Sequence, residues 1–132
     1  AYKIFKDNFF FGVGIKNFRD QVRKEKYENR EYKFTAKRST THPHQVHYEF
    51  LSETGFVGYI SFLIFILSSL YLAIKSYFFT KNLFQLSGIL FVLTSILPII
   101  PSGSFFSTFS SSIFWINYAI MFIYLKKSDF KI

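Results

Sequence analysis

An abrupt change in charge after Thr54 constrains this chain more than any other feature. Between Thr54 and Ser128 the sequence contains no Asp, Glu or Arg. The charged residues of that stretch are Lys75, Lys81, Lys126 and Lys127. Residues 56–74 form an uncharged run, FVGYISFLIFILSSLYLAI, which is close to the roughly 20 residues that an α-helix needs to cross a hydrocarbon core. The pattern predicts a membrane protein.

Two further apolar runs follow the first. One extends from residue 83 to about residue 100, where Pro98 and Pro101 would break a helix. The other begins within the serine-rich stretch 104–112 and ends at Leu125. We therefore predict an all-α membrane protein in which residues 1–54 form a charged loop with short helices. Residues 55–132 would form three transmembrane helices, about 56–76, 83–101 and 106–125, followed by a tail.

Composition agrees with this class. Half of the residues are hydrophobic and 23% are aromatic, which is ordinary for a membrane protein and high for a soluble domain. Cysteine is absent, which excludes disulfides and thiolate metal sites. The chain opens at Ala1 without a recognisable signal peptide, and we expect it to be the C-terminal piece of a longer membrane protein.

The basic residues also predict the orientation. Only charges within roughly 15–20 residues of a span direct insertion. By that rule residues 1–54 contribute mainly Lys37 and Arg38, whereas the other side contributes five lysines, at positions 75, 81, 126, 127 and 131. The total count of Lys and Arg, eleven before residue 55 and five after it, would predict the reverse. Because distant charges matter little, we predict that residues 1–54 lie outside and the C-terminus in the cytoplasm.

Residues 1–54 form a basic arm, with eleven Lys or Arg against seven Asp or Glu. A basic arm beside a membrane suits an anionic partner such as a phosphate, a diphosphate or a lipid headgroup, and a solvated loop of mixed charge is the alternative. Acids and bases interleave between residues 20 and 40. That spacing favours an exposed helix or a mobile loop and disfavours nucleic-acid binding. Gly12-Val13-Gly14 lacks the third glycine of a dinucleotide loop and is typical of a turn.

The residues best suited to chemistry lie at the junction, in THPHQVHYEFLSETGFVG at 41–58. They are His42, His44, His47, Glu49, Glu53, Gly55 and Gly58. A helix start is predicted within 41–45, because Pro43 suits a first helical position, where its missing N–H costs nothing. On a continuing helix His44, His47 and Leu51 would share one face, and the two glutamates another. The glycines would permit close approach of another backbone.

These residues alone leave three interpretations open. The histidines would cap helices or lie at the membrane interface without chemistry. Alternatively, with Glu49 or Glu53 they offer nitrogen and oxygen ligands that zinc accepts. The H-x-H spacing is typical of strands, however, and Pro43 restricts the relative aim of its neighbours, so we predict no metal. The third interpretation is acid–base work on a sugar or phosphate, in which a neutral imidazole accepts a proton and Arg or Lys holds a diphosphate.

His44-Gln45, nine residues, and then Gly55-Phe56-Val57-Gly58 resembles the signature of the O-antigen ligase family. That signature is a His followed by Asn, Ser or Gln, nine variable residues and G-x-x-G. The string HPHQVHYEFLSETGFVG is similar to the family's HPHN…L.E.G..G pattern. FGVGIKNF at 11–18 resembles the G-x-G-x-x-F segment that opens the family's large periplasmic loop, with one extra residue before its last Phe. Three spans before a cytoplasmic tail resemble its last three helices.

The resemblance implies a multi-pass glycosyltransferase of the bacterial inner membrane, with residues 1–54 and the active site on the periplasmic side. Such enzymes take a glycan from undecaprenyl diphosphate and pass it to an acceptor. The acceptor is lipid A–core for the ligases, and another glycan or a protein for close relatives that polymerise O-antigen or glycosylate protein. The expected partners are the lipid-linked glycan, its acceptor and membrane lipids. No cofactor, metal or nucleic acid is expected.

The resemblance also implies roles for individual residues. His44 matches the motif histidine and would take the proton of the acceptor hydroxyl as that oxygen attacks the anomeric carbon. Arg38 is the leading candidate to stabilise the departing diphosphate, followed by Arg19 and Lys37, and Glu53 would fix the helix and His44. The other predicted site residues are His42 and His47 toward the substrate, and Gln45, Gly55 and Gly58 as support. The non-enzymatic alternative is a membrane anchor whose basic arm binds anionic lipid or a partner.

Overall fold

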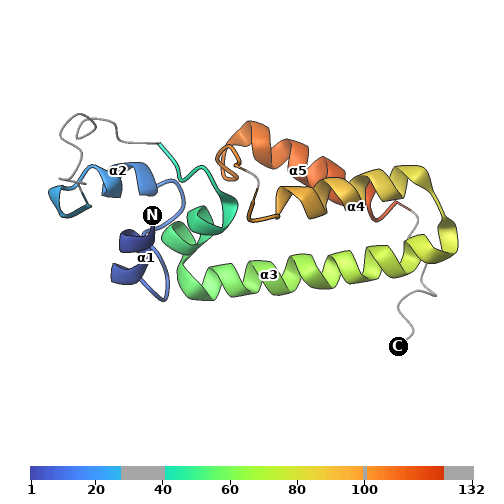
Figure 1. The fold of residues 1–132 in the computed structure, drawn as a ribbon, viewed down its shortest axis with the longest axis horizontal. Helices are drawn as coiled ribbons and strands as arrows, with labels where there is room; N and C mark the ends of the chain where they lie inside the picture. The colour runs from blue at the N-terminus through green and yellow to red at the C-terminus, as the bar shows by residue number, and fades with distance from the viewer. Residues whose placement is uncertain (28–40, 100, 124–132) are drawn as a thin grey trace.

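The computed structural model describes residues 1–27, 41–99 and 101–123 (Figure 1). Within these ranges the chain forms helices and turns and no strand, which confirms the all-α prediction for this part of the protein. The elements are α1 (Tyr2–Asp7), α2 (Phe18–Val22), a short 3-10 helix (Glu25–Tyr27), α3 (Val46–Thr80), α4 (Leu83–Ser95) and α5 (Thr108–Ile120). Most of the polar stretch predicted at 20–40, and the predicted tail, lie outside the described residues.

α3 is the long axis of the molecule (Figure 1). α4 and α5 lie along one side of it, and α1 and α2 gather at its N-terminal end. Gln45 has an extended backbone (φ −160°) and caps α3, since its side-chain oxygen accepts the Tyr48 N–H at 3.2 Å. Pro43 therefore precedes the helix, and the prediction that it occupies the first helical position is wrong. His44 also lies before the helix and shares no helical face with His47.

α3 is interrupted at Gly55, where φ is +70° and ψ is −171°. An unbroken helix would join the Phe56 and Val57 N–H groups to the carbonyls of Ser52 and Glu53. The segment 9–14 replaces both bonds. Its Phe9 and Phe10 carbonyls accept from Phe56 and Val57 at 2.7 and 3.2 Å, respectively. Its Val13 and Gly14 N–H groups donate to Ser52 and Glu53 at 3.0 and 2.8 Å, respectively. The segment 9–14 thus pairs with the backbone groups that the interruption of α3 leaves without a helical partner.

Glycine is required in both segments of this contact, at Gly12 and Gly14 in the loop and at Gly55 in α3. Gly12 has φ +65° and Gly14 φ +93°, which confirms the turn predicted for this G-x-G. A Cβ on Gly12 would overlap the Glu53 carbonyl and the Gly55 nitrogen, and a Cβ on Gly55 would overlap the Phe10 carbonyl oxygen. The close approach predicted for Gly55 is therefore made with the segment 9–14.

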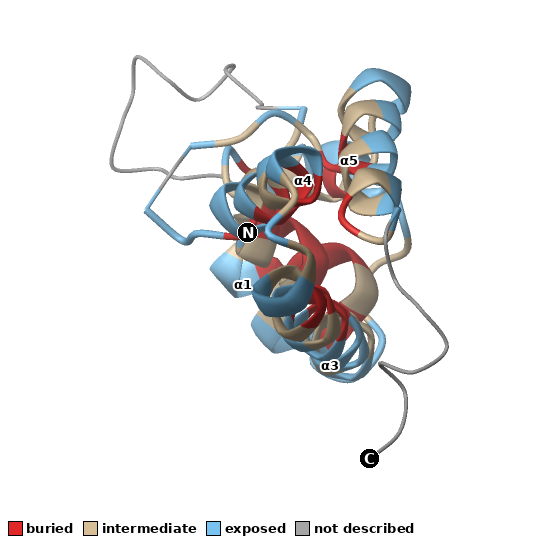
Figure 2. Ribbon diagram, turned by 90° about the vertical axis from the view of Figure 1, so that its right-hand side faces the viewer, coloured by how far each residue is buried: buried red, intermediate tan, exposed pale blue. Residues whose placement is uncertain are grey.

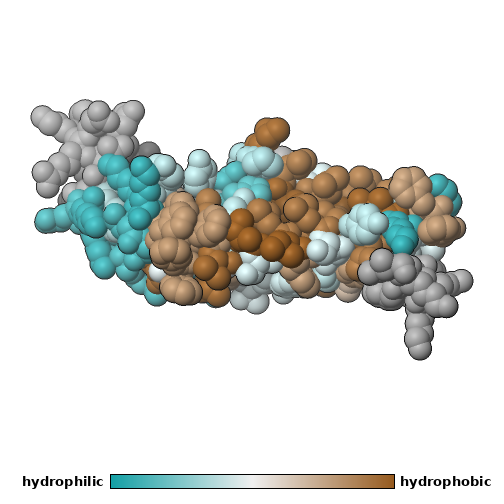
Figure 3. Space-filling view, turned by 90° about the horizontal axis from the view of Figure 1, so that it is seen from below, coloured by the Kyte–Doolittle hydropathy of each residue, from teal (hydrophilic) through white to brown (hydrophobic). Residues whose placement is uncertain are grey.

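The part of α3 after the kink, residues 56–80, extends for about 37 Å at 1.5 Å per residue. Among the described residues α3 is the one helix long and apolar enough to cross a membrane. The first predicted span, 56–76, lies within it, although Lys75 does not end the helix. Lys81 does so in a left-handed conformation, φ +50°. Seen from below, hydrophilic residues gather at the α1–α2 end and a hydrophobic face follows α3 (Figure 3).

α4 and α5 are shorter than the spans predicted at 83–101 and 106–125. Each has 13 residues, which is about 20 Å of helix against a hydrocarbon core of about 30 Å. α4 ends at Ser95, three residues before Pro98, as expected for a helix approaching proline. α5 begins after Ser107, whose side chain accepts the Ser110 N–H at 3.2 Å. Three membrane crossings therefore stay a prediction.

The core lies where α3, α4 and α5 face one another (Figure 2). Its most buried apolar residues include Ile66, Leu70, Ala73, Ile89, Val92, Phe114 and Met121. Gly88 lets α5 approach α4 closely, since a Cβ there would lie 2.6 Å from the Met121 nitrogen. The fully buried amide of Gln85 joins the three helices, donating to the Met121 carbonyl at 3.2 Å and accepting from the Thr80 hydroxyl at 2.6 Å. A buried amide with partners on both atoms fixes the relative rotation of the helices.

Gly55→Ala is expected to destabilise the protein by roughly 1–3 kcal/mol, because alanine would be strained at positive φ and its Cβ would push the segment 9–14 away. Thermal unfolding in detergent micelles measures the change as a lower midpoint. Gly103→Ala is the matched control, since its Cβ would meet the Ser110 hydroxyl at an ordinary 3.5 Å. Equal midpoints for the two variants would contradict the role given to Gly55.

Candidate functional site

A polar pocket of about 520 Å³ lies between the basic arm and the loop that joins α4 to α5. We call it the basic pocket. Its lining residues are Lys16, Arg19, Thr41, His42, Glu53, Gly103, Ser104, Ser107, Thr108 and Ser110. They come from three separate stretches of sequence and from the short part of α3 before the kink. The pocket therefore exists only when the arm, α3 and the α4–α5 loop are assembled.

Glu53 positions the cationic wall of the pocket. Its carboxylate is 3% exposed and accepts the Lys16 N–H at 2.7 Å and the Phe18 N–H at 3.3 Å. Phe18, the first residue of α2, is buried, whereas the Lys16 and Arg19 side chains beside it are exposed. Burial raises the pKa of Glu53, and the two N–H bonds oppose that rise. The carboxylate therefore holds the turn that presents both cations.

Glu49 holds the opposite wall in the same way. It is fully buried, one helical turn before Glu53, and it accepts from the Ser104 hydroxyl and from the Phe105 N–H, the latter at 2.7 Å. Burial raises its pKa above the usual value, and these hydrogen bonds offset part of the rise. Ser107 and Thr108 follow at the start of α5, where the helix carries partial positive charge.

The histidines are divided among different surroundings. His42 lines the basic pocket, and its Nδ1 lies 3.0 Å from the Thr41 hydroxyl. Burial is the larger cause, and the charge of His44 the smaller one, of a lowered pKa for His42. The exposed His44 packs its ring edge to face against that of His42, with centroids 4.7 Å apart. His47 lies elsewhere: its Nε2 is 2.8 Å from the Ile96 carbonyl oxygen and its Nδ1 is 3.0 Å from the Tyr59 hydroxyl.

Of the predicted site residues, Arg19, His42 and Glu53 meet around the basic pocket, and His44 adjoins it through His42. Glu53 contacts the turn at Lys16, where the prediction had it fix His44. Lys37 and Arg38 lie outside the described residues. The other predicted residues are part of the framework: Gln45 caps α3 and donates to the Pro98 carbonyl at 2.9 Å, Gly55 forms the kink, and Gly58 packs against the Thr54 side chain.

Sequence reasoning missed Lys16 and the serines of the pocket. Lys16 stands inside FGVGIKNF, the segment that carried part of the resemblance, so its place in that motif was an available signal. The serines at 104, 107 and 110 belong to the serine-rich stretch in which the third span is predicted to begin. Nothing local marks them as pocket residues, because Glu49, which fixes Ser104, is 55 positions away in sequence.

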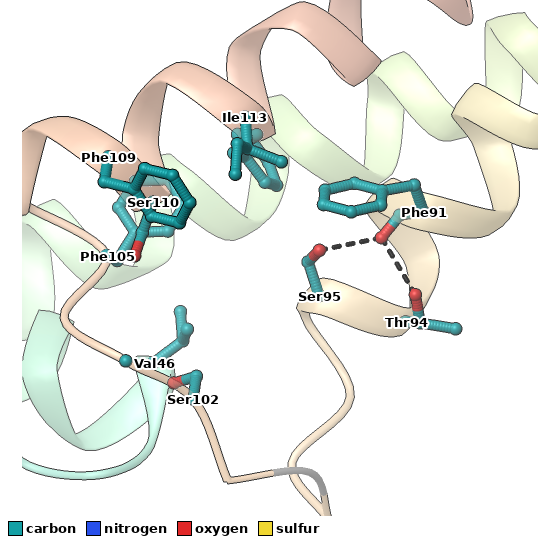
Figure 4. Close-up of a pocket in the computed structure, with 11 residues that line it drawn as sticks. Val46, Phe91, Thr94, Ser95, Ser102, Phe105, Phe109, Ser110 and Ile113 are labelled. Carbon is teal, nitrogen blue, oxygen red and sulfur yellow. Dashed lines mark hydrogen bonds between the residues drawn. The ribbon is translucent and has the colours of Figure 1, made fainter.

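An apolar pocket of about 400 Å³ adjoins the basic pocket (Figure 4). α4 contributes Phe91, Thr94 and Ser95, and α5 contributes Phe109, Ser110, Ile113 and Phe114. Val46 and Ser102 close the opposite side, together with Gly103 and Phe105. The two pockets share Gly103 and Ser110. A polar site and an apolar site thus meet across one short stretch of the α4–α5 loop.

Within the described ranges, no group of three or more His, Asp or Glu lies close enough together to hold a metal ion. Comparisons with protein-family models, curated proteins and solved structures gave no match for this chain. The functional argument therefore starts from the basic pocket and from the motif at 44–58.

Glu49→Gln tests whether burial of the ionised Glu49 carboxylate costs free energy of folding. Because the pKa of Glu49 is raised above 4.5, the folded state binds its proton more readily than the unfolded state does. The free energy of unfolding should therefore fall as pH rises from about 4.5 through the raised pKa. Glutamine cannot ionise, so the variant should show a shallower fall over that window. Denaturant titrations in micelles at a series of pH values measure the slope.

Asp7→Asn is the control of opposite sign. Hydrogen bonds from Lys26 and Tyr27 lower the pKa of Asp7, so its contribution to stability is present above 3.8 and lost as pH falls further. That variant should lower the free energy of unfolding by a constant amount above 3.8 and should change its pH dependence only below 3.8. A steeper fall above pH 4.5 in Glu49→Gln than in the unmodified protein would contradict the buried-carboxylate account.

Proposed function

We propose that this chain is the C-terminal part of an O-antigen ligase-like glycosyltransferase, which moves a glycan from undecaprenyl diphosphate to lipid A–core on the periplasmic face of the bacterial inner membrane. The observation that carries the proposal is the basic pocket. It gathers Lys16, Arg19, His42 and the N-terminus of α5 beside the motif residue His44. Its lining residue Glu53 lies three residues before Phe56, where the apolar segment of α3 begins.

The chemistry of the basic pocket suits an anion with several oxygens. Lys16 and Arg19 supply charge, Arg19 in a fork that matches phosphate, and serine and threonine hydroxyls supply further donors. The volume lies within the range of small-molecule sites. Glu53 is the one carboxylate among the lining residues. Its two oxygens each accept a backbone N–H group, so its charge is partly compensated within the pocket wall.

The apolar pocket supports a lipid-linked donor rather than a free phosphate. A polyprenyl diphosphate needs a polar site for its head next to an apolar site for its first isoprene units. The two pockets supply that pair, with Gly103 and Ser110 between them. In this proposal the diphosphate lies toward Arg19 and the hydrocarbon toward Phe91 and Ile113.

The reaction then needs one proton acceptor. His44 would take the proton of the acceptor hydroxyl as that oxygen bonds to the anomeric carbon, while the bond from that carbon to the diphosphate breaks. The diphosphate leaves with the bonding electrons, and the cations of the pocket, with Arg38 and Lys37 of the same arm, would stabilise its charge. His42 lies between His44 and the pocket, where it would orient the base.

The proposed membrane topology has three crossings, with the basic pocket outside and the C-terminus in the cytoplasm. α3 supports the first crossing by its length and composition. For the other two, the short helices α4 and α5 would continue into the non-helical backbone at 96–99 and 101–107. Such backbone is tolerated near membrane depth where it is covered by protein or lines a cavity. Glu49, Gln45 and His47 bond to that stretch, and both pockets are lined by it.

His44→Ala in the complete protein is expected to lower glycan transfer by about 10²–10⁴-fold, the usual contribution of a general base. Arg19→Lys should lower it by about tenfold, because lysine keeps the charge but loses the second charge-assisted hydrogen bond to the diphosphate. Lipopolysaccharide laddering in cells, and transfer to lipid A–core in vitro, measure both. Normal folding of each variant is checked by its unfolding midpoint.

Arg23→Lys is the matched control, since Arg23 belongs to the same arm but does not line the basic pocket. Transfer by this variant should be unchanged. The non-enzymatic alternative predicts that function follows the total charge of the arm and ignores His44. Unchanged laddering in His44→Ala would therefore remove His44 from catalysis. Loss of a polymer or of protein glycosylation, with ligation intact, would assign the same donor chemistry to a different acceptor.

A further inference from the structure

Three consecutive aromatic side chains project from the segment 9–14, which hydrogen-bonds to α3 on both sides of its kink. Phe9, Phe10 and Phe11 are 42%, 62% and 79% exposed. Solvent exposure of three adjacent phenylalanines is unfavourable in water, because each leaves a large apolar area unburied. We call these residues the aromatic loop. Nothing in the glycan-transfer chemistry uses them, so their exposure needs a separate explanation.

The aromatic loop is fixed at one height along α3. Its Phe9 and Phe10 carbonyls accept from the N–H groups of Phe56 and Val57, the first residues of the apolar segment. The rings of Phe9 and Phe56 stack with centroids 5.2 Å apart and planes 12° apart. Phe56 and Val57 are themselves 43% and 46% exposed. The loop and the first turn of the apolar segment therefore form one continuous hydrophobic surface.

The surroundings of the aromatic loop change from polar to apolar along α3. Its neighbours in sequence include the exposed basic residues Lys3, Lys6 and Lys16, and the acid Asp7 is paired with Lys26 at 2.8 Å. Toward the far end lie the exposed apolar side chains of α3, such as Ile64 and Leu67. Figure 3 shows the hydrophilic end giving way to the hydrophobic face along this direction. Aromatic rings between cations and hydrocarbon are typical of a membrane–water interface.

From these contacts we propose that the aromatic loop inserts into the boundary between headgroups and acyl chains, in the leaflet where α3 begins its crossing. The partner is the lipid bilayer itself, with anionic headgroups favoured by the neighbouring lysines. Insertion fixes the height of the basic pocket above the hydrocarbon, since Gly12 and Gly14 join the loop directly to the turn that carries Lys16 and Arg19. The inference rests on the membrane crossing of α3 in the proposed function and is independent of glycan transfer.

Tryptophan fluorescence in proteoliposomes tests the depth. Trp115, the single tryptophan of the chain, is first replaced by phenylalanine. Three variants then carry one tryptophan each: Phe11→Trp in the aromatic loop, Leu67→Trp near the middle of α3, and Tyr48→Trp on the part of α3 before the kink. Vesicles of phosphatidylcholine and phosphatidylglycerol carry bromine at defined positions along the acyl chains, and acrylamide quenches from the water side.

The inference predicts a separate quenching profile for each position. Phe11→Trp should lose most fluorescence with bromines near the headgroups, Leu67→Trp with bromines near the chain ends, and Tyr48→Trp with acrylamide alone. Acrylamide quenching of Phe11→Trp without lipid quenching, or protection from both quenchers by a covering protein segment, would overturn the inference while Leu67→Trp still reports the crossing. Lack of lipid quenching at Leu67→Trp would overturn the crossing and the inference together. Lipopolysaccharide laddering reports glycan transfer separately from every one of these outcomes.

Discussion

The hydrogen-bond exchange at Gly55 is the interaction on which the rest of the structure depends. A kink in a helix at the start of an apolar segment frees two N–H groups and two carbonyls, and unpaired backbone groups are costly where water is scarce. The segment 9–14 pairs all four, with its own carbonyls and N–H groups. Detaching the arm would therefore expose both sides of the kink at once. This reciprocity makes the segment 9–14 and α3 one unit, although the paired residues are distant in sequence.

The short part of α3 before the kink then assembles the pocket. Glu49 and Glu53 stand one turn apart and reach in different directions, to the α4–α5 loop at Ser104 and to the arm at Lys16. Both carboxylates are buried, and burial raises both pKa values. The cost is offset because each carboxylate accepts backbone or hydroxyl donors on both oxygens. Because the two walls of the pocket are held by adjacent turns of one helix, the distance between them is fixed.

The sequence revealed what depends on neighbouring residues. The loss of acids after Thr54, the long apolar run and the turn at Gly12 are local patterns, and the structure has a helix and a turn there. The start of α3 was wrong by a few residues, because a glutamine cap competed with the proline signal. α4 ends before Pro98 and α5 begins after the Ser107 cap, so both helices are shorter than the apolar runs from which the spans are predicted.

The functional residues were harder to predict, because they depend on contacts between distant segments. His47 looked equivalent to His42 and His44, yet it bonds to the Ile96 carbonyl 49 positions away and belongs to the framework. Lys16 became a pocket residue only because Glu53, 37 positions on, holds its backbone. A histidine cluster in sequence therefore separates into one ring that fixes the α4–α5 loop and two that adjoin the pocket.

The position of the basic pocket along α3 matters for the proposed chemistry at a membrane surface. In the proposed reaction a base meets a lipid-linked substrate whose own depth is set by the bilayer, so the height of the base matters as much as its basicity. Two walls of the basic pocket are tied to the turn of α3 before Gly55, through Glu53 and Glu49, and the segment 9–14 bonds to α3 on both sides of the kink. In the proposed membrane topology, the depth of the pocket would then be fixed by where the apolar part of α3 begins. The kink would therefore set two properties of the basic pocket at once. One is the alignment of its charged groups with one another, and the other is their distance from the hydrocarbon.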